Sequence, residues 1–440
     1  MWGSHWSILL EKRGIPGVYI VDEPFIDDVQ VTCEKEGMPA LRRVNVIHPC
    51  GAVPDSDMPR IMKEIVKTLT ASLTKEEQQT GILKAKPVPR IAVTGTLSEV
   101  HDFFSKNRWT DGLPIIPPTE DKVKEMLKGT SHPPDKIVVE KMLPESWGVT
   151  VEKVAIVGVM AGCKPEYMPV LMAMVEAFSK EQFSSAVRST NSFSFMTVVN
   201  GPIAGEIGMN SGINALGAGT RNDANASIGR FLRLAIINLG GSDTSVSDMS
   251  SQGNPSKFSF AFAENEEKSP WEPFHVSMGF KKNESVVTIF SGGWAHAGND
   301  GGLNVVARWI ANFELPWGAA VMIDPLAARQ MVAKGFTTRE KVQEYLWKNA
   351  TLTAKQFREV DNDQTGSYTI FIKPVLDGRI MYGMRDIWPR WYKDAPDDKI
   401  IQVYGRKEFI YIFVVGGETN PFVTSWKMAF PAAVSVDKWR

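Results

Sequence analysis

Runs of apolar residues along this chain follow two alternating patterns. GVYIVD (17–22), FMTVVN (195–200) and ESVVTIF (284–290) are continuous and rich in β-branched residues, as buried strands are. The stretch from Met58 to Ser72 instead carries Ile61, Ile65, Val66 and Leu69 at the spacing of one helix face. Because strand-like and helix-like segments follow one another along most of the chain, the pattern predicts an α/β fold.

The first ninety residues predict a partial doubly wound unit. Helices are expected over 6–12, 28–35 and 58–72, and strands over 17–22 and 41–49. Half a sheet does not bury its own faces, so we expect the missing strands to come from a second copy, from a partner subunit or from sequence upstream of Met1. A polar and then proline-broken stretch, 73–90, follows. We therefore divide the chain into a partial α/β domain, 1–88, and a large α/β domain, 89–440, with a candidate subdivision near residue 315.

Four strand-like runs of the large domain lead into loops of small residues. They are VEKVAIVGVM (151–160), FMTVVN, ESVVTIF and FIYIFVV (409–415), and VSVDKW (434–439) is expected as an edge strand. In α/β sheets, ligands bind beyond the carboxyl ends of the strands. If the strands are neighbours, their loops converge on one cavity, which would collect Cys163, Asn210, Arg221, Asn222, Asn225, His296, Asn299, Asp300 and Glu418.

The glycine-rich stretch after FMTVVN is the predicted binding side of that cavity. It has glycines at 201, 205, 208, 212, 217 and 219, and a helical run from Ala226 to Leu239 follows. A glycine-rich loop that opens a helix exposes N–H groups to an anion. Arg221, Asn222 and Asn225, with Asn210, are the predicted donors to the substrate, and Asp111 in the stiff DGLPIIPPT segment (111–119) is a candidate wall residue. The glycine-rich stretch could instead be a tight strand-to-helix connection that ends in an Asx cap and binds no ligand. Asp111 could instead be a turn residue.

Three residues are candidates for catalysis in the large domain. Cys163 follows a predicted strand, and a helix N-terminus there would lower the pKa of the thiol, although a buried thiol fits equally well. His296 lies among glycines with Asp300 four residues on, as a general acid/base or a metal ligand. One His and one Asp fall short of a metal site, and Glu264 and His275 are the further candidate ligands.

Composition excludes several classes. The 49 basic residues balance 50 acidic ones, which argues against nucleic-acid or polybasic membrane binding. Three scattered cysteines, no apolar run of membrane-helix length and no signal-peptide pattern indicate a soluble, cytoplasmic protein. We find no P-loop, dinucleotide or nucleophile-elbow motif, so no nucleotide cofactor is indicated, and a divalent metal remains the candidate cofactor.

The first domain resembles a known family of selenoproteins. LEKRGIPGVYIVDEPF, a short helix, GMPALRRVNVIHPCG and a long helix ending in LT are similar to the substrate-reducing selenoprotein of glycine reductase, component B, and to the UGSC family. In those proteins a selenocysteine or cysteine, then Gly, Ser or Thr, then Cys lies before the first helix. The matching positions here are Trp2, Gly3, Ser4 and His5.

Trp2 and His5 cannot act as a thiolate or selenolate. Three hypotheses follow. In the first, the redox site has degenerated, so that the domain has only a structural or assembly role. In the second, its chemistry has changed, with His5 as acid/base or ligand. In the third, the redox residues are missing from the sequence, because the true start lies upstream of Met1 or because Trp2 stands in place of a selenocysteine.

The large domain resembles the poorly characterised domain that accompanies UGSC-type proteins. DGLPIIPPT, AGCKPEYMPV, NGPIAGEIGMNSGINALG and ENEEKSPWEPFHV carry this resemblance. The resemblance of the first domain implies an oxidoreductase or lyase that cleaves a bond between carbon and a heteroatom, whereas the resemblance of the large domain supplies no activity. The glycine-rich strand-end loops predict a small anionic or amide-bearing organic substrate. The alternatives are a non-redox hydrolase or lyase that uses His296, Asp300 and Cys163, and a non-catalytic ligand-binding or assembly subunit.

Overall fold

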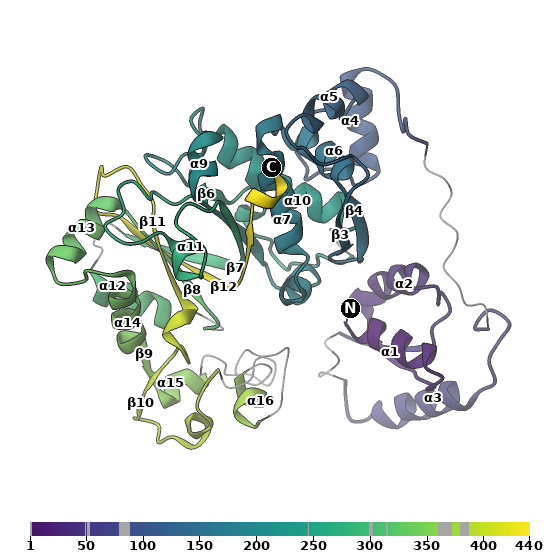
Figure 1. Cartoon of the computed structure of the whole chain (residues 1–440). Coiled ribbons are helices and arrows are strands. Elements are labelled where there is room, and N and C mark those ends of the chain that lie inside the picture. The colour runs from purple at the N-terminus through teal and green to yellow at the C-terminus, as the bar shows by residue number, and fades with distance from the viewer. Residues whose placement is uncertain are drawn as a thin grey trace. The chain divides into compact units, whose positions relative to one another are not determined.

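The computed structural model describes residues 2–48, 50, 53–78, 89–244, 246–298, 302–313, 316–359, 372–378 and 387–440. The contacts within it separate two compact units (Figure 1). The first unit is Met1–Gly95 with Ser242–Met249, and the second is Thr96–Gly241 with Ser250–Arg440. Both combine helices with strands, so the fold is α/β.

The first unit contains the predicted succession of three helices and two strands. The elements are α1 (Trp2–Lys12), β1 (Tyr19–Asp22), α2 (Ile26–Lys35), β2 (Arg43–Val46) and α3 (Met58–Thr70). The two strands pair in parallel, with Ile20 beside Val44. Helix α1 begins four residues before its predicted start and therefore includes the WGSH segment.

Each face of this small sheet has its own core. Ile8, Val21 and Val29 form one core with Cys33 and Leu41. On the other face, Val44 and Val46 pack against Ile61 of α3. Helix α3 is also apolar on its outward side, where Met58, Met62, Val66 and Leu69 are 41–55% exposed. Apolar side chains at this spacing form a stripe along the helix.

The second unit is built around a six-stranded sheet in the order β11-β8-β12-β7-β5-β6. The strands, all among the residues that the structure describes, are β5 (Ser194–Asn200), β6 (Ala261–Ala263), β7 (Val286–Gly298), β8 (Ala319–Ile323), β11 (Ile410–Val414) and β12 (Val423–Ser435). The pairs β5–β6 and β8–β11 are parallel, whereas every pairing between them is antiparallel. The strand order is thus symmetric. One half is the parallel pair β5–β6 beside β7, the other is the parallel pair β8–β11 beside β12, and β7 and β12 each have 13 residues.

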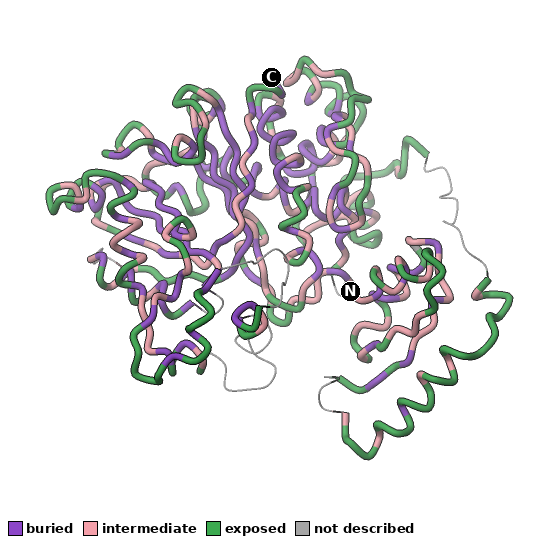
Figure 2. Tube along the Cα trace, turned by 60° about the horizontal axis from the view of Figure 1, so that its bottom comes forward, coloured by how far each residue is buried: buried purple, intermediate pink, exposed green. Residues whose placement is uncertain are grey.

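The sheet curls, so that its two edge strands approach each other. The ring centroids of Phe262 on β6 and Phe413 on β11 are 5.9 Å apart. Phe274 and Phe290 join the same cluster, with centroids 4.6 and 5.8 Å from that of Phe413. The curled sheet thus encloses an aromatic core, and Figure 2 shows long buried stretches along its strands and along the helices beside them.

Helices cover the outer face of the curled sheet, whose inner face encloses the aromatic core. α7 (Met168–Phe178) packs on β7 and β12, and it is surrounded in turn by α6 (Val151–Ala161) and α10 (Asp223–Asn238). α12 (Leu303–Ala311), α13 (Pro325–Ala333) and α14 (Arg339–Asn349) belong to the core beside β8 and β11. The remaining helices are α4 (Leu97–Lys106), α5 (Glu120–Leu127), α8 (Ser184–Val187), α9 (Pro202–Glu206), α11 (Phe274–Ser277), α15 (Ala354–Glu359) and α16 (Lys373–Leu376). Two antiparallel pairs lie outside the main sheet: β3 (Ile137–Met142) with β4 (Trp147–Thr150), and β9 (Thr351–Thr353) with β10 (Ile400–Gln402).

Three expectations about the second unit are wrong. Residues 151–160 were expected as a strand but form α6, which begins at the Thr150 cap and ends at Gly162 with φ +85°. Residues 291–298 were expected as a loop but continue β7, because they pair with β12 from Met428 back to Val423. Finally, β12 includes the start of the predicted edge strand 434–439, yet it is a central strand between β7 and β8.

Candidate functional site

The carboxyl ends of β6 and β11 meet in the second unit. The backbone N–H of Asn265 donates to the carbonyl oxygen of Val414 at 2.7 Å, and the Asn265 side chain donates to the Gly416 carbonyl at 3.2 Å. The Gly416 N–H donates in turn to the Ser211 carbonyl of the glycine-rich stretch at 3.0 Å. The loops after β6 and β11 and the glycine-rich stretch are therefore neighbours. We refer to this place as the strand-end site.

Asp324, directly after β8, fixes the loop that follows β11. One carboxylate oxygen caps α13 by accepting the Leu326 N–H at 2.8 Å. The other accepts the Glu418 N–H at 3.0 Å. Gly416 has φ +135°, and a Cβ there would lie 2.4 Å from the Asp324 carboxylate, so this close approach requires glycine.

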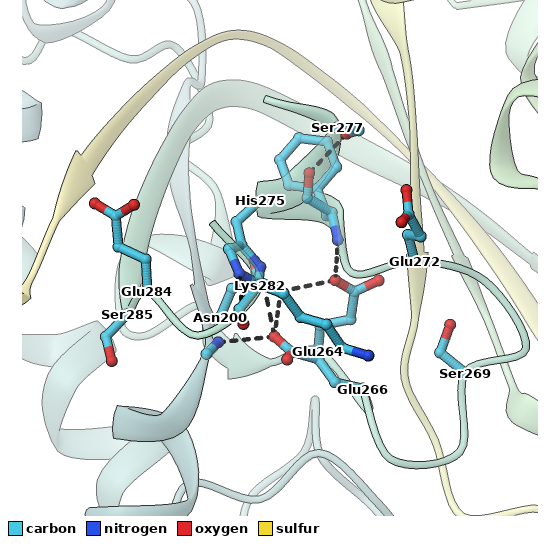
Figure 3. A network of polar contacts seen from close by, with 12 residues as sticks. Asn200, Glu264, Glu266, Ser269, Glu272, His275, Ser277, Lys282, Glu284 and Ser285 are labelled. Atoms are coloured by element: carbon cyan, nitrogen blue, oxygen red, sulfur yellow. Dashed lines mark hydrogen bonds and ion pairs between the residues drawn. The ribbon is translucent and has the colours of Figure 1, made fainter. Parts of the chain in front are cut away.

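Beneath the strand-end site lies a buried ion pair between Glu264 and Arg339. The two residues are 3% and 4% exposed, and Arg339 donates to the Glu264 carboxylate at 2.7 Å. That carboxylate also accepts the Asn200 side-chain amide and the Phe274 N–H, both at 2.7 Å (Figure 3). Because these donors saturate the carboxylate, Glu264 acts as a charged structural centre and does not fit the metal-ligand role considered from the sequence.

Glu266 and His275 form the second layer of the network in Figure 3. The Glu266 carboxylate accepts from the Asn200 side chain and from the Gly201 N–H, both at 2.8 Å, and its side chain is 25% exposed. His275 is fully buried, and its Nε2 lies 3.1 Å from the Lys281 carbonyl. A carbonyl only accepts, so we assign the proton to Nε2. Nδ1 then faces the Glu266 carboxylate at 3.7 Å, and no described residue hydrogen bonds to it.

The rim of the strand-end site carries two cations around one carboxylate. Lys268, after β6, and Arg329, on α13, both contact the Glu418 carboxylate. The Lys268 and Arg329 side chains are 48% and 49% exposed, and that of Glu418 is 23% exposed. Hydrogen bonds from Lys268 and then Arg329 lower the pKa of Glu418, so it is ionised at neutral pH. Two positive charges and one negative charge therefore meet at a surface that solvent reaches.

The amides predicted to bind substrate instead hold the glycine-rich stretch together. Asn222 donates to the carbonyls of Asn214 and Gly217. Asn225 donates to the Asn210 carbonyl at 2.8 Å and accepts the Asn210 N–H at 2.9 Å. Asn222 and Asn225 are 1% and 2% exposed, whereas Arg221 is exposed.

Asp111 and Cys163 lie beside α10. Asp111 forms a two-bond ion pair with Arg230, at 2.8 and 2.9 Å, which fastens the DGLPIIPPT segment to that helix. Cys163 follows the C-terminal end of α6, and burial raises the pKa of its thiol to about 12 despite a hydrogen bond from Ser227. The helix N-terminus that would favour a thiolate is therefore missing at Cys163.

His296 lies on β7 opposite Ser425 of β12. Its side chain is exposed, and its ring stacks near Phe313 and Trp309, with centroids 5.4 and 6.3 Å away. Asn299 and Asp300 lie outside the residues that the structure describes. Within the described part of the chain, no three His, Cys, Asp or Glu side chains are grouped to hold a metal.

Comparison with known proteins finds a family match, which lies in the first unit. Residues 2–75 match the model of the UGSC family. The match agrees with the resemblance carried by LEKRGIPGVYIVDEPF and GMPALRRVNVIHPCG, and it leaves the second unit unassigned. Neither the search of curated proteins nor the search of solved structures found a match to this chain. None of the helices that the structure describes is long and apolar enough to cross a membrane.

In the UGSC-like unit, the WGSH segment is the start of α1. A Cβ at Gly3 would approach the Tyr19 ring to 2.4 Å, and Ser4 is fully buried. His5 is partly buried, with Nδ1 3.7 Å from the Glu36 carboxylate. The Gly-Ser pair of the family pattern is therefore accounted for by close packing in this chain.

The sequence did not single out Arg339, Glu266, Lys268, Arg329 or Asp324. Two signals were present. Asp324 directly follows the buried strand AAVMI, and Glu264, Glu266 and Lys268 follow a short apolar run in the segment ENEEK. From the sequence, the acidic ENEE run was interpreted as a solvated face. The strand before it, β6, has only three residues and so gives little sign of a strand end.

Proposed function

We propose that the second unit binds a small organic anion at the strand-end site and cleaves a bond between carbon and a heteroatom in it. The single observation that carries the proposal is the pair Lys268 and Arg329, two half-exposed cations where the carboxyl ends of two strands meet. Cations at strand ends are a common means of fixing a substrate carboxylate or phosphate.

In this proposal Glu266 is the group that transfers a proton. Its carboxylate is partly exposed, and two N–H donors hold it in place. His275 lies behind it, with Nδ1 3.7 Å from the Glu266 carboxylate. The oxidoreductase or lyase class is the one that the resemblance of the first unit to glycine reductase component B and UGSC proteins implies, and the cytoplasm is the site of action expected from the sequence.

The proposal is tested by anion binding and then by turnover. The full chain and the variants Lys268→Ala, Arg329→Ala and the double variant are titrated calorimetrically with malonate. We expect a loss of about tenfold for each single variant, because a charge-assisted hydrogen bond is worth roughly 1.5–3 kcal/mol and 1.4 kcal/mol is a tenfold change. Lys348→Ala, an exposed lysine paired with Glu344 on α14, is the matched control and should bind like the wild type. Equal binding by the wild type and the three rim variants excludes the rim as the site.

A panel of small organic acids, analysed for products by mass spectrometry, then tests catalysis. Glu266→Gln should abolish turnover of any acid that the wild type converts, while its malonate affinity stays within about twofold, since Glu266 does not belong to the cationic pair. Turnover that survives in Glu266→Gln would remove Glu266 from the proposed reaction.

A second candidate function is that of a partner-binding subunit. It is favoured by the apolar stripe Met58, Met62, Val66 and Leu69 on α3. Such a stripe is typical of a protein interface. If the stripe binds a second copy, Met62→Glu should convert an oligomer to a monomer in light scattering, and Lys67→Glu on the same helix should not. A wild-type protein that is monomeric at all concentrations contradicts self-association.

A further inference from the structure

Glu418 combines an unusual backbone conformation with an unusual side-chain position. Its φ is +62°, in the left-handed region that residues other than glycine and asparagine rarely adopt. The N–H of Glu418 is held by the Asp324 carboxylate at 3.0 Å. Residues kept in this region cluster at binding sites, where the surrounding structure enforces them.

The side chain of Glu418 lies where two other elements deliver positive charge. Lys268 comes from the loop after β6 and Arg329 from the second turn of α13, and each contacts the same carboxylate. Both cations remain half exposed, so a solute can reach them. A carboxylate supplied by the chain thus occupies the position that a ligand's carboxylate would take between the two cations.

We propose that Glu418 is a resident carboxylate that fills the anion site of the free protein and is displaced by the carboxylate of a ligand. This inference rests on the proposed function, because it assumes that Lys268 and Arg329 bind the ligand. It specifies the ligand class, since a group that replaces a glutamate side chain is a small, flat carboxylate. Withdrawal needs only a rotation of the Glu418 side chain, because the Asp324 carboxylate continues to hold the Glu418 backbone N–H.

The decisive experiment compares malonate affinity in chains that lack the resident carboxylate. Glu418→Gln removes the charge and keeps the shape, and Glu418→Asn places a residue suited to positive φ at the same position. Both should bind malonate at least tenfold more tightly than the wild type. Glu344→Gln, an exposed glutamate paired with Lys348, is the matched control and should leave the affinity unchanged. Adding Arg329→Ala to Glu418→Gln should remove the gain.

The remaining outcomes separate the role of Glu418 from anion binding by Lys268 and Arg329. If the wild type binds malonate and neither Glu418 variant binds more tightly, Glu418 is no competitor, and the proposed function stands without it. If Glu418→Gln keeps its tight binding when Arg329→Ala is added, the ligand lies elsewhere. If no chain binds malonate, the inference and the anion-binding proposal both fail. Inorganic phosphate is titrated in parallel, and a gain for phosphate that equals the gain for malonate refutes the preference for a carboxylate.

Discussion

Replacement of Arg339 by methionine should strongly destabilise the second unit. Arg339 is 4% exposed and donates to the Glu264 carboxylate, to the Glu272 carbonyl at 3.2 Å and to the Ile412 carbonyl. Methionine fills a similar volume but donates no hydrogen bond. The variant therefore leaves a buried carboxylate without its cation and two carbonyls without a donor.

The magnitude follows from what remains around Glu264. Breaking one partner out of a buried ion pair costs about 3–5 kcal/mol. The Asn200 and Phe274 donors stay on the Glu264 carboxylate, which favours the lower half of that range, while each orphaned carbonyl adds about 1 kcal/mol. We expect a total loss of about 5–6 kcal/mol. Removing both charges, in Glu264→Gln with Arg339→Met, should cost less than the sum of the single changes, with a coupling energy of about 2 kcal/mol.

The assay is urea denaturation of the full chain, followed by tryptophan fluorescence. Trp271 reports on this region, because its indole N–H donates to the Phe336 carbonyl at 2.9 Å, three residues before Arg339. Lys348→Ala on α14 is the control and should change the free energy of unfolding by no more than about 0.5 kcal/mol, since Lys348 and Glu344 form an exposed pair. A loss below about 1 kcal/mol for Arg339→Met would refute a buried charge pair at this place.

Three further predictions concern the cysteines, one glycine and the glycine-rich stretch. Iodoacetamide at pH 8 should label exposed Cys50 and spare Cys163, because a pKa raised to about 12 leaves roughly one Cys163 thiol in 10⁴ ionised. Peptide mass spectrometry measures the labelling, and preferential labelling of Cys163 would show that it is a nucleophile. Gly201→Ala should cost more than about 2 kcal/mol in urea denaturation, because φ is +82° and a Cβ would lie 2.2 Å from a backbone oxygen. Gly205→Ala, with open space around it in α9, should be neutral or stabilising, and equal effects of the two changes would contradict this account. Asn222→Ala should speed tryptic cleavage after Arg221 in timed digests, because the carbonyls of Asn214 and Gly217 lose their hydrogen-bond donor. An unchanged cleavage rate would show that the glycine-rich stretch keeps its conformation without this amide.

Segments with a clear hydrophobic period or a helix-capping residue could be assigned to helix or strand from the sequence. Thr119 ends the DGLPIIPPT segment, and like other threonines at N-cap positions it accepts a backbone N–H, that of Lys122, at the start of α5. The strands FMTVVN and ESVVTIF also lie where the apolar pattern places them. In the first unit, the alternation of strands and helices was sufficient, because each element packs on its neighbours in the chain.

The errors arise where distant segments decide the structure. VEKVAIVGVM is rich in Val and Ile, which favour strands, but α6 is buried on most sides, so no polar face reveals the helical period. SGGWAHAG has the small residues of a loop and becomes strand only through pairing with residues 423–428. The partners of Glu264 come from positions 64 residues before and 75 residues after it, and no local pattern indicates that they meet.

The position of β12 has a consequence for the order in which the protein is made. Each of the other five strands of the sheet precedes β12 in the chain, yet β12 lies between β7 and β8. Until residues 423–435 leave the ribosome, no strand pairing among the described residues joins β8–β11 to the group β7–β5–β6. Each half then presents an open edge, and the edge of β7 is 13 residues long. During synthesis this long edge is open to pairing with other nascent chains, so the last strand to emerge both completes the sheet and ends its exposure to aggregation.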